Sequence, residues 1–355
     1  MKLFQETIGI RSRDGRPIGE ISIKGKCDIL KERAKEFANE ILKYQGVVGI
    51  SLGGGLSRGY GDHLSEIDLN IYLEDDVYHE WIIGMGPIPH GDALWKDTWV
   101  DIAFYSYEKE YSEQWGLTKK WDASYNIILF DSEEKIKKLF NDKDVFTSQE
   151  KYDLVFKFFQ ECEYFGDLVV RQWIERLDPL SANQLLNLGV SGLIGMVFLA
   201  NDEYPPHPKW ALNYSYSLKW LPKNWRERIS KIILTKEISL NEAKRRLRAF
   251  TRLYKECKEK IFGKNLKNLG FIEISTMEEL QFIIDNSPVQ IEKFAETFDL
   301  IHLSYEPIFE FTKILIKNNK RMITFNKEKY IKHKKQNFPT VLDWSKPLLN
   351  NLSLN

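Results

Sequence analysis

Three acidic side chains stand in short apolar segments of this 355-residue chain, at a spacing that could bring them together. Glu66 and Asp68 alternate with isoleucine and leucine, and residues two apart on a strand point to the same side of a sheet. Asp101 stands in a second apolar segment, Trp99–Tyr105, where burying a lone carboxylate would cost roughly several kcal/mol. Because hard oxygen ligands on one face suit Mg²⁺, we predict a metal site formed by these three residues.

A glycine cluster precedes the acidic pair. The apolar segment Val47–Leu52 runs directly into three glycines, and a serine and an arginine follow, at Gly53, Gly54, Gly55, Ser57 and Arg58. Glycines lack a side chain, so a phosphate can approach their backbone N–H groups closely, with the hydroxyl and the cation beside it. A glycine cluster alone is typical of an ordinary turn, but the acidic residues that follow favour a nucleotide- and metal-binding loop.

The combined pattern resembles the signature of the nucleotidyltransferase superfamily, which includes DNA polymerase β and the aminoglycoside and lincosamide nucleotidyltransferases. That signature is an apolar strand, Gly-Gly or Gly-Ser, Ser-Arg-Gly, an interval, Asp-x-Asp and a later acidic residue on a strand. The matching positions are Gly54-Gly55, Ser57-Arg58-Gly59, Ser65-Glu66-Ile67-Asp68 and Asp101. The chain departs from the signature twice: Glu66 replaces an aspartate, which lengthens that ligand by one methylene, and Gly55 replaces a common serine.

The resemblance implies transfer of a nucleoside monophosphate, by default AMP from ATP, to a hydroxyl acceptor, with Mg²⁺ as cofactor. It assigns catalysis and metal binding to Glu66, Asp68 and Asp101, with Asp101 also able to accept the proton of the acceptor. It assigns nucleotide binding to six further residues: Gly54, Gly55, Ser57, Arg58, Ser65 and Lys209. The lysine lies in the segment Asn201–Trp210, which is similar to a segment of small-molecule members whose lysine reaches the nucleotide phosphates.

Several alternatives stay open. Glu66 can also be read as a solvated strand residue, with Asp68 and Asn70 as the inward pair. A second reading of the whole chain is a catalytically silent nucleotide-binding module, in which Glu66 marks one step of decay.

The acceptor is also open. A small molecule such as an aminoglycoside-like compound is favoured, and a cationic one would need an acidic cleft, for which Glu161, Glu163 and Asp167 are candidates. The same core serves toxins that modify protein or tRNA, and the basic segment Lys313–Lys335 keeps that alternative open. For this segment a solvated helix face is the favoured interpretation.

Composition narrows the class of protein further. The chain has 51 basic and 51 acidic residues, so net charge favours neither nucleic acid nor membrane as a partner. Cys27, Cys162 and Cys257 lack the paired spacing of a disulfide framework or zinc site. Because the N-terminus has no apolar signal core and no apolar run approaches a membrane span, we expect a cytoplasmic protein. The oligomeric state cannot be inferred.

The elements that position these residues are predicted from periodicity. We expect an α+β fold: a small mixed-sheet nucleotidyltransferase domain at 1–148, an α-helical bundle at 149–264 that clamps substrate and nucleotide, and a helical, basic extension at 265–355. A hairpin around Asp14-Gly15 is predicted over Thr7–Ile23. The other predicted elements are a helix at Asp28–Tyr44, strands at Val47–Leu52, Ile67–Leu73, Trp99–Tyr105 and Tyr125–Phe130, and later helices that include Leu185–Leu199 and Leu240–Glu259.

Overall fold

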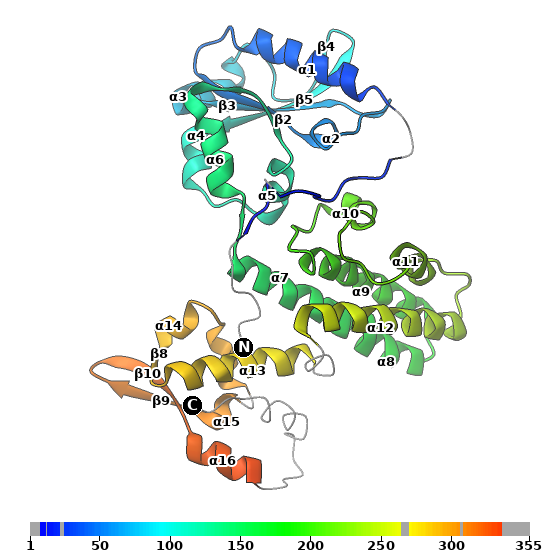
Figure 1. The fold of residues 1–355 in the computed structure, drawn as a ribbon, viewed down its shortest axis with the longest axis vertical. Helices are drawn as coiled ribbons and strands as arrows, with labels where there is room; N and C mark the ends of the chain where they lie inside the picture. The colour runs from blue at the N-terminus through cyan, green and yellow to red at the C-terminus, as the bar shows by residue number, and fades with distance from the viewer. Residues whose placement is uncertain (1–7, 12, 22–24, 264–269, 306–307, 336–355) are drawn as a thin grey trace. The chain divides into compact units, whose positions relative to one another are not determined.

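The computed structural model describes residues 8–11, 13–21, 25–263, 270–305 and 308–335 (Figure 1). The chain is α+β, as predicted. Its described residues form two compact units: a sheet unit, from the ranges 6–147 and 194–229, and a helix-rich unit, from the ranges 148–193 and 230–355. The division into three domains stays a prediction.

A five-stranded sheet forms the centre of the sheet unit (Figure 1). Its strand order is β4-β5-β3-β2-β6. The strands are β2 (Val47–Leu52), β3 (Ile67–Leu73), β4 (Gly91–Trp95), β5 (Thr98–Ser106) and β6 (Ile127–Asp131). β3 and β5 are parallel, and the other neighbouring pairs are antiparallel. The four predicted strands are therefore confirmed, with the fourth beginning two residues later, whereas β4 was not predicted.

Helices cover both faces of this sheet. α1 (Cys27–Ile41) buries Leu30, Phe37 and Ile41 against the apolar side chains of β3 and β5, which confirms the predicted first helix. α6 (Lys135–Lys143) packs Ile136, Leu139 and Phe140 on the other side of the sheet. The remaining short elements of this part are α2 (Gly54–Ser57), α3 (Asp75–Glu80), η1 (Trp81–Met85), α4 (Tyr107–Ser112), α5 (Leu117–Ala123), η2 (Ser132–Glu134) and α10 (Pro208–Ser215).

The predicted N-terminal hairpin is wrong for the residues that the structure describes between 8 and 21. Asp14 and Gly15 do form a turn, with Gly15 at φ 67°, but no strand follows it there. Instead β1 (Ile8–Gly9) pairs with the distant β7 (Val145–Phe146). The segment after β1 is rich in arginine, whose side chains bind carbonyl and carboxylate groups far away in the sequence, so these long-range contacts replace local strand pairing.

The helix-rich unit is built from long helices. The run from Ser148 to Glu175 comprises α7 (Ser148–Gln160), a π-helical stretch η3 (Glu161–Leu168) and α8 (Val169–Glu175). α12 (Leu240–Phe262) confirms the predicted charged helix, and it buries Leu247, Phe250 and Leu253. α9 (Pro179–Leu199) and α11 (Trp225–Ile233) each begin in one unit and end in the other.

α9 is the one helix of the described chain that is long and apolar enough to cross a membrane. Of its most apolar window, 72% is buried inside the protein. Core helices of folded proteins pass the same test of length and composition, so α9 is weak evidence for a membrane span.

The C-terminal extension is not uniformly helical, which corrects the prediction for this part. It contains α13 (Phe271–Asn286), α14 (Ile291–Ala295), η4 (Leu300–Ser304), α15 (Ile308–Phe311) and α16 (Lys327–Lys335). A three-stranded sheet of β8 (Val289–Gln290), β10 (Lys320–Phe325) and β9 (Thr312–Lys317) accompanies them. Asn318 and Asn319, at φ 51° and 58°, form the two-residue turn between β9 and β10, a conformation that asparagine tolerates well. Much of the basic segment Lys313–Lys335 is therefore a hairpin, and only its last part is helix.

Candidate functional site

The floor of the candidate site is one face of the parallel strands β3 and β5. Their register places Asp68 beside Asp101 and Tyr72 beside Tyr105. The alternate residues of β3, including Ile67, are fully buried in the core beneath, as predicted. One end of this floor is thus acidic and the other aromatic, and the two tyrosine rings stack at 5.4 Å between centroids.

Glu66, Asp68 and Asp101 come together at the acidic end. One carboxylate oxygen from each lies within 4.8 Å of the other two, with Glu66 exposed and both aspartates half-buried. Within the described part of the chain, no hydrogen bond or ion pair to these three carboxylates is found. Three acidic groups that lack a protein cation at this distance fit a divalent metal ion, which would neutralise them and accept oxygen ligands.

The cluster raises the pKa of two of its members. Burial, followed by the charges of Glu66, Asp122 and Asp101, raises the pKa of Asp68 to about 7. Burial and the charges of Asp101 and Asp92 likewise raise the pKa of Glu66, and only Lys209 opposes this change. Asp92 lies beside Asp101 in the pairing of β4 with β5, so a fourth carboxylate extends the acidic row to the neighbouring strand.

The glycine turn lies directly against Asp68. Gly54 has φ 58°, and a Cβ atom at this position would overlap the carboxylate of Asp68. The N–H of Gly53 donates a hydrogen bond of 2.9 Å to the backbone carbonyl of Asp68. A Cβ on Gly55 would come within 2.6 Å of the Tyr60 ring. The glycines are therefore required for packing of the turn, in addition to any role in phosphate binding.

The polar residues predicted to bind nucleotide near the turn already have partners within the protein. The Ser57 hydroxyl donates to the carbonyl of Gly54 at 2.9 Å, and Ser65 Oγ accepts the N–H of Asp62 at 2.9 Å. The Arg58 guanidinium forms an ion pair with Asp122, and its side chain is only 5% exposed. Burial is the largest single effect and would lower the pKa of Arg58, but Asp122, Tyr60 and Tyr214 together outweigh it, so the pKa is raised.

Lys209 lies in the first turn of α10, in the same unit as the acidic cluster. It is exposed, and the influence of its charge on Glu66 indicates that the two side chains are near each other. The following Trp210 packs against Tyr60 at 5.1 Å between ring centroids. The structure thus places the predicted lysine beside the predicted metal ligands, although its contact with a nucleotide stays a prediction.

A cavity of about 550 Å³ lies over the parallel strands, between the glycine turn, α5 and the start of α10. The predicted residues Gly54, Arg58, Asp68, Asp101 and Lys209 line it, together with others that the sequence did not single out. The latter are Leu69, Asn70, Tyr72, Ala103, Tyr105, Trp115, Thr118, Lys119, Trp121, Asp122, Ala123, Asn126, His207 and Trp210.

Some of these additional cavity residues could have been predicted from the alternation of side chains along a strand. Tyr72 and Tyr105 each lie four residues after a predicted metal ligand, so they share its face. α5 gives no such signal, because its pocket residues Lys119 and Asp122 contact groups that are distant in the sequence. Lys119 pairs with Glu110 at 2.5 Å and lies 4.5 Å from the centroid of the Tyr105 ring.

The acidic residues proposed for a cationic acceptor are in the helix-rich unit and are largely occupied there. Glu163 accepts a hydrogen bond from Tyr254 at 2.8 Å and pairs with Lys258 at 3.2 Å. Asp167 pairs with Arg171 at 2.7 Å. These pairs compensate the charges of Glu163 and Asp167, which weakens their case as a binding surface for a cation.

No protein-family model and no curated protein matches this chain. Among solved structures, the chain is similar to that of a nucleotidyltransferase-like protein from Exiguobacterium sibiricum 255-15. The identity is 12%, the match covers 83% of this chain and 99% of that chain, and the TM-score is 0.43. A similarity at this level establishes neither the family nor the activity of the chain.

Proposed function

We propose that this protein is a nucleotidyltransferase that moves a nucleoside monophosphate from a nucleoside triphosphate, by default ATP, to a hydroxyl acceptor. The observation that supports it most is the convergence of Glu66, Asp68 and Asp101 beside a glycine turn, at the acidic end of a cavity with an aromatic floor. Carboxylates in this arrangement suit Mg²⁺ alongside substrate phosphates.

Each group has a distinct task in this proposal. Glu66, Asp68 and Asp101 would hold Mg²⁺, which when bound would neutralise charge that develops on the phosphates. The backbone N–H groups of the turn at Gly54 and Gly55 would bind phosphate oxygens, and Lys209 would supply a mobile positive charge. The base or sugar of the nucleotide would pack on Tyr105 of the aromatic floor and on Trp121 of α5, which both line the cavity.

The chemical step is an in-line displacement at the α-phosphorus. The acceptor oxygen forms a bond to this phosphorus while the bond to the bridging oxygen of the β-phosphate breaks, and pyrophosphate leaves. Asp101 accepts the proton that the hydroxyl releases, because it is half-buried and lines the floor of the cavity. Atoms and charge balance without a further reactant.

For the acceptor, a small molecule remains our proposal, with protein or tRNA as outcomes of the test. The neutral net charge gives no support to a large nucleic-acid partner. Acidic groups cluster at the site itself, where Asp92 continues the row begun by Asp68 and Asp101. A neutral or cationic acceptor suits such a surface better than an anionic one.

A second candidate, a metal- and nucleotide-binding module without transfer activity, is favoured by one observation. Ser57 and Arg58, which the resemblance assigns to the phosphates, are bound to Gly54 and Asp122 instead. A triphosphate would need to compete with Asp122 for Arg58. Arg58 would therefore bind the substrate more weakly than the sequence pattern suggests.

Labelled ATP, GTP, CTP and UTP incubated with Mg²⁺ against pools of small molecules, tRNA and protein would test the proposal. We expect label to enter one pool with release of pyrophosphate, and Asp101→Asn to abolish transfer. Calorimetry separates the two candidates: Mg²⁺-dependent nucleotide binding without release on any acceptor supports the silent module. If Asp68→Ala left nucleotide binding and turnover intact, the metal-site assignment would be wrong.

A further inference from the structure

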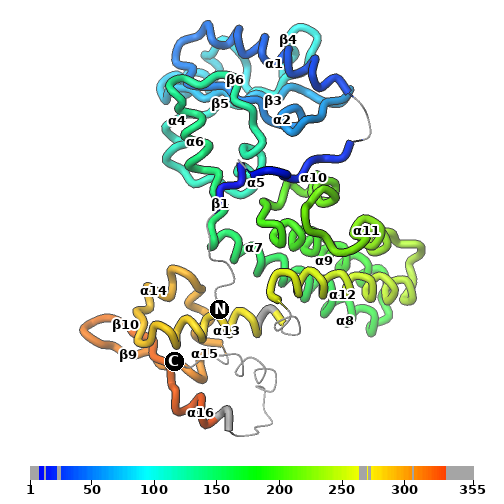
Figure 2. The backbone as a smooth tube through the Cα atoms, in the orientation of Figure 1, coloured from blue at the N-terminus to red at the C-terminus, as the bar shows by residue number. Residues whose placement is uncertain are grey.

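An arginine-rich N-terminal strap, defined as residues 11 and 13–20, crosses the sheet unit between α5 and the segment that leads into α10 (Figures 1 and 2). Both of these segments supply walls of the cavity: α5 supplies Lys119 and Asp122, and the later segment supplies Lys209. The strap itself does not line the cavity among the described residues. The strap instead contacts α5 and the segment that leads into α10, which form walls of the cavity.

The contacts with α5 are made at its C-terminal end. Arg11 donates hydrogen bonds to the carbonyls of Ala123 and Asn126 at 2.8 and 2.7 Å. Arg16 donates to Ser124, at 2.7 Å to the hydroxyl and 3.1 Å to the carbonyl. Cations favour a helix C-terminus because the last carbonyls lack partners within the helix. The strap therefore holds the end of one cavity wall.

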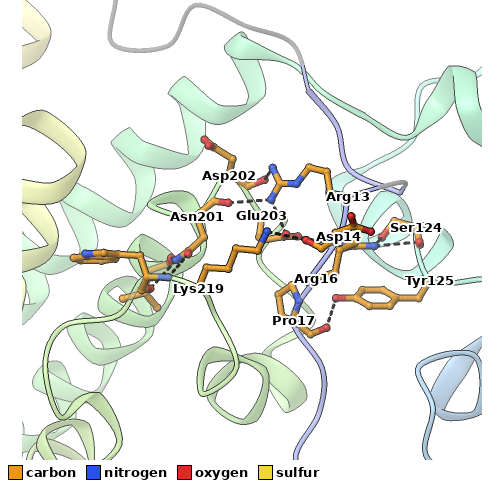
Figure 3. Close-up of polar contacts among 12 residues, drawn as sticks. Arg13, Asp14, Arg16, Pro17, Ser124, Tyr125, Asn201, Asp202, Glu203 and Lys219 are labelled. Carbon is orange, nitrogen blue, oxygen red and sulfur yellow. Dashed lines mark hydrogen bonds and ion pairs between the residues drawn. The ribbon is translucent and has the colours of Figure 1, made fainter.

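The contacts with the second wall are made at the turn before α10. Arg13 donates to the carbonyls of Asn201 and Asp202 at 3.0 and 2.9 Å. Lys219 donates to the carbonyl of Asp14 at 2.7 Å, which anchors the far side of this wall to the same strap (Figure 3).

Glu203 joins the two sets of contacts. Its carboxylate pairs with Arg13 at 2.7 Å and with Arg16 at 3.4 Å, and its side chain is only 5% exposed (Figure 3). A buried carboxylate that is shared by two arginines fixes both of them, because removal of the acid would leave two cations facing each other away from solvent. Arg16 is bound to the end of α5, and Arg13 is bound to the turn before α10.

We propose that the strap positions the cavity walls relative to each other, and that Glu203 is the positioning residue through which it acts. In this role the strap sets how far Lys209 and α5 stand from the acidic floor, and so how well the site grips a phosphorylated ligand. The proposal rests on the proposed function for its ligand, but the coupling between the walls is independent of it.

The chain supplies a graded set of variants. Arg13→Gln removes the arm to the 201–203 turn, and Arg16→Gln removes the arm from Glu203 to Ser124 while Arg11 keeps its own bonds to the end of α5. Glu203→Gln removes the carboxylate charge that Arg13 and Arg16 share. Glu20→Gln is a matched control, because it breaks an exposed ion pair between Glu20 of the same strap and Arg226 without removing the contact of Arg226 with the Tyr216 ring. The single-arm variants also serve if Glu203→Gln folds poorly.

Amide hydrogen exchange of the full-length protein measures the coupling between the two cavity walls in the absence of a ligand. We expect Glu203→Gln to accelerate exchange in both 117–126 and 207–216, and each single-arm variant to act mainly on its own wall. The control is expected to match the wild type. Acceleration confined to the residues around 203 would overturn the proposal.

ATP affinity and kinetics then test the functional part. For Glu203→Gln we expect KM for Mg-ATP to rise about tenfold with kcat changed less than about threefold, and Mn²⁺ affinity at the acidic cluster to be unchanged. A purely structural role would lower the apparent kcat and the number of Mn²⁺ sites per chain in proportion to the folded fraction and leave KM unchanged, and that result would overturn the positioning role. If the wild type binds no nucleotide, the proposed function fails, while the exchange pattern still decides whether the walls are coupled.

Discussion

At the scale of single residues, Gly54 is subject to two constraints, a positive φ and contact with Asp68, a predicted metal ligand. Gly59 shares the positive φ, at 89°, but a Cβ atom there would meet nothing within 4 Å. Both substitutions to alanine should cost roughly 1–2 kcal/mol through the left-handed backbone. Gly54→Ala alone should displace the carboxylate of Asp68.

The expected outcome is a loss of Mg²⁺ or Mn²⁺ affinity of about tenfold or more for Gly54→Ala and little change for Gly59→Ala. Metal titration by calorimetry, with urea unfolding of the same samples, separates the two effects. Equal metal affinity in both variants would show that the turn does not hold Asp68 in place.

Asp68 also predicts how pH acts on the metal-free protein. Its pKa is raised to about 7 in the folded state, against about 3.9 for an unfolded aspartate. Between these values the folded state binds a proton that the unfolded state has released, so stability falls as pH rises from about 4 to about 7. Asp68→Asn should therefore increase the free energy of unfolding at pH 8, by roughly 1–3 kcal/mol, and the gain should vanish near pH 4.

Urea unfolding in a chelator at pH 4, 6 and 8 measures this difference. Metal binding should show the complementary dependence, because Mg²⁺ competes with the same proton and loses affinity about tenfold per pH unit below about pH 7. A variant that is less stable than the wild type at pH 8 would contradict the raised pKa.

The candidate site was partly predictable at this scale. Asp68 and Asp101 could be placed because each interrupts an apolar strand, and a buried acid in such a strand needs a partner. The ion pair of Arg58 with Asp122 could not be predicted, since the two residues are 64 positions apart and no local pattern links them. The sequence assigned this arginine to phosphate, whereas in the structure its charge is compensated by the protein.

At the scale of elements, three helices of the helix-rich unit meet at Arg246 of α12. This side chain is fully buried, and it donates hydrogen bonds to the carbonyl of Ile232 at 2.5 Å and to Asn183 and Asn187 of α9 at 2.5 and 2.6 Å. Burial lowers the pKa of Arg246, so its neighbours must stabilise the charge through these hydrogen bonds.

Arg246→Ala should destabilise the protein by roughly 3–5 kcal/mol, because it opens a cavity and leaves buried carbonyl groups unpaired. The exposed Arg248 on the same helix is the control, and its alanine variant should lie within about 0.5 kcal/mol of the wild type. Urea unfolding monitored by circular dichroism compares them. Similar stabilities for the two variants would mean that the helices do not depend on this arginine.

Helices and central strands were predictable because their periodicity is repeated over many residues, as in α1 and α12. The strands β9 and β10 were not predicted, since their lysines suggested a solvated helix face. Their β-branched residues, and the two asparagines between them, were the signals for a hairpin. The opposite error occurred at Asp14-Gly15, where a good turn signal lacks the second strand that a hairpin needs.

At the scale of the whole molecule, the sheet unit is discontinuous, since Ile194–Ile229 belongs to it. The later segment supplies Tyr204, whose ring lies 4.9 Å from that of Phe146, and Tyr214, whose ring lies 5.7 Å from that of Trp121. A fragment that ends at residue 148 would lack these contacts and the shared carboxylate of Glu203.

We therefore expect the fragment 1–148 to unfold without a cooperative transition and to bind Mg²⁺ at least about tenfold more weakly than the full chain. Thermal melts followed by near-UV circular dichroism, with Mn²⁺ titrations of both proteins, provide the comparison. A sharp melt at the temperature of the full-length protein would contradict this expectation.

The separation of Arg13 from Glu203 by 190 positions also has a consequence for synthesis. At about 5–20 residues per second, roughly 10–40 s pass between the emergence of the arginine and that of its partner. During this interval the nascent chain carries the acidic cluster and the strap without the second wall. The cavity is therefore completed only after residues 148–193 of the helix-rich unit have been translated, so a chain that is truncated before residue 203 carries the acidic cluster without the second wall of the cavity.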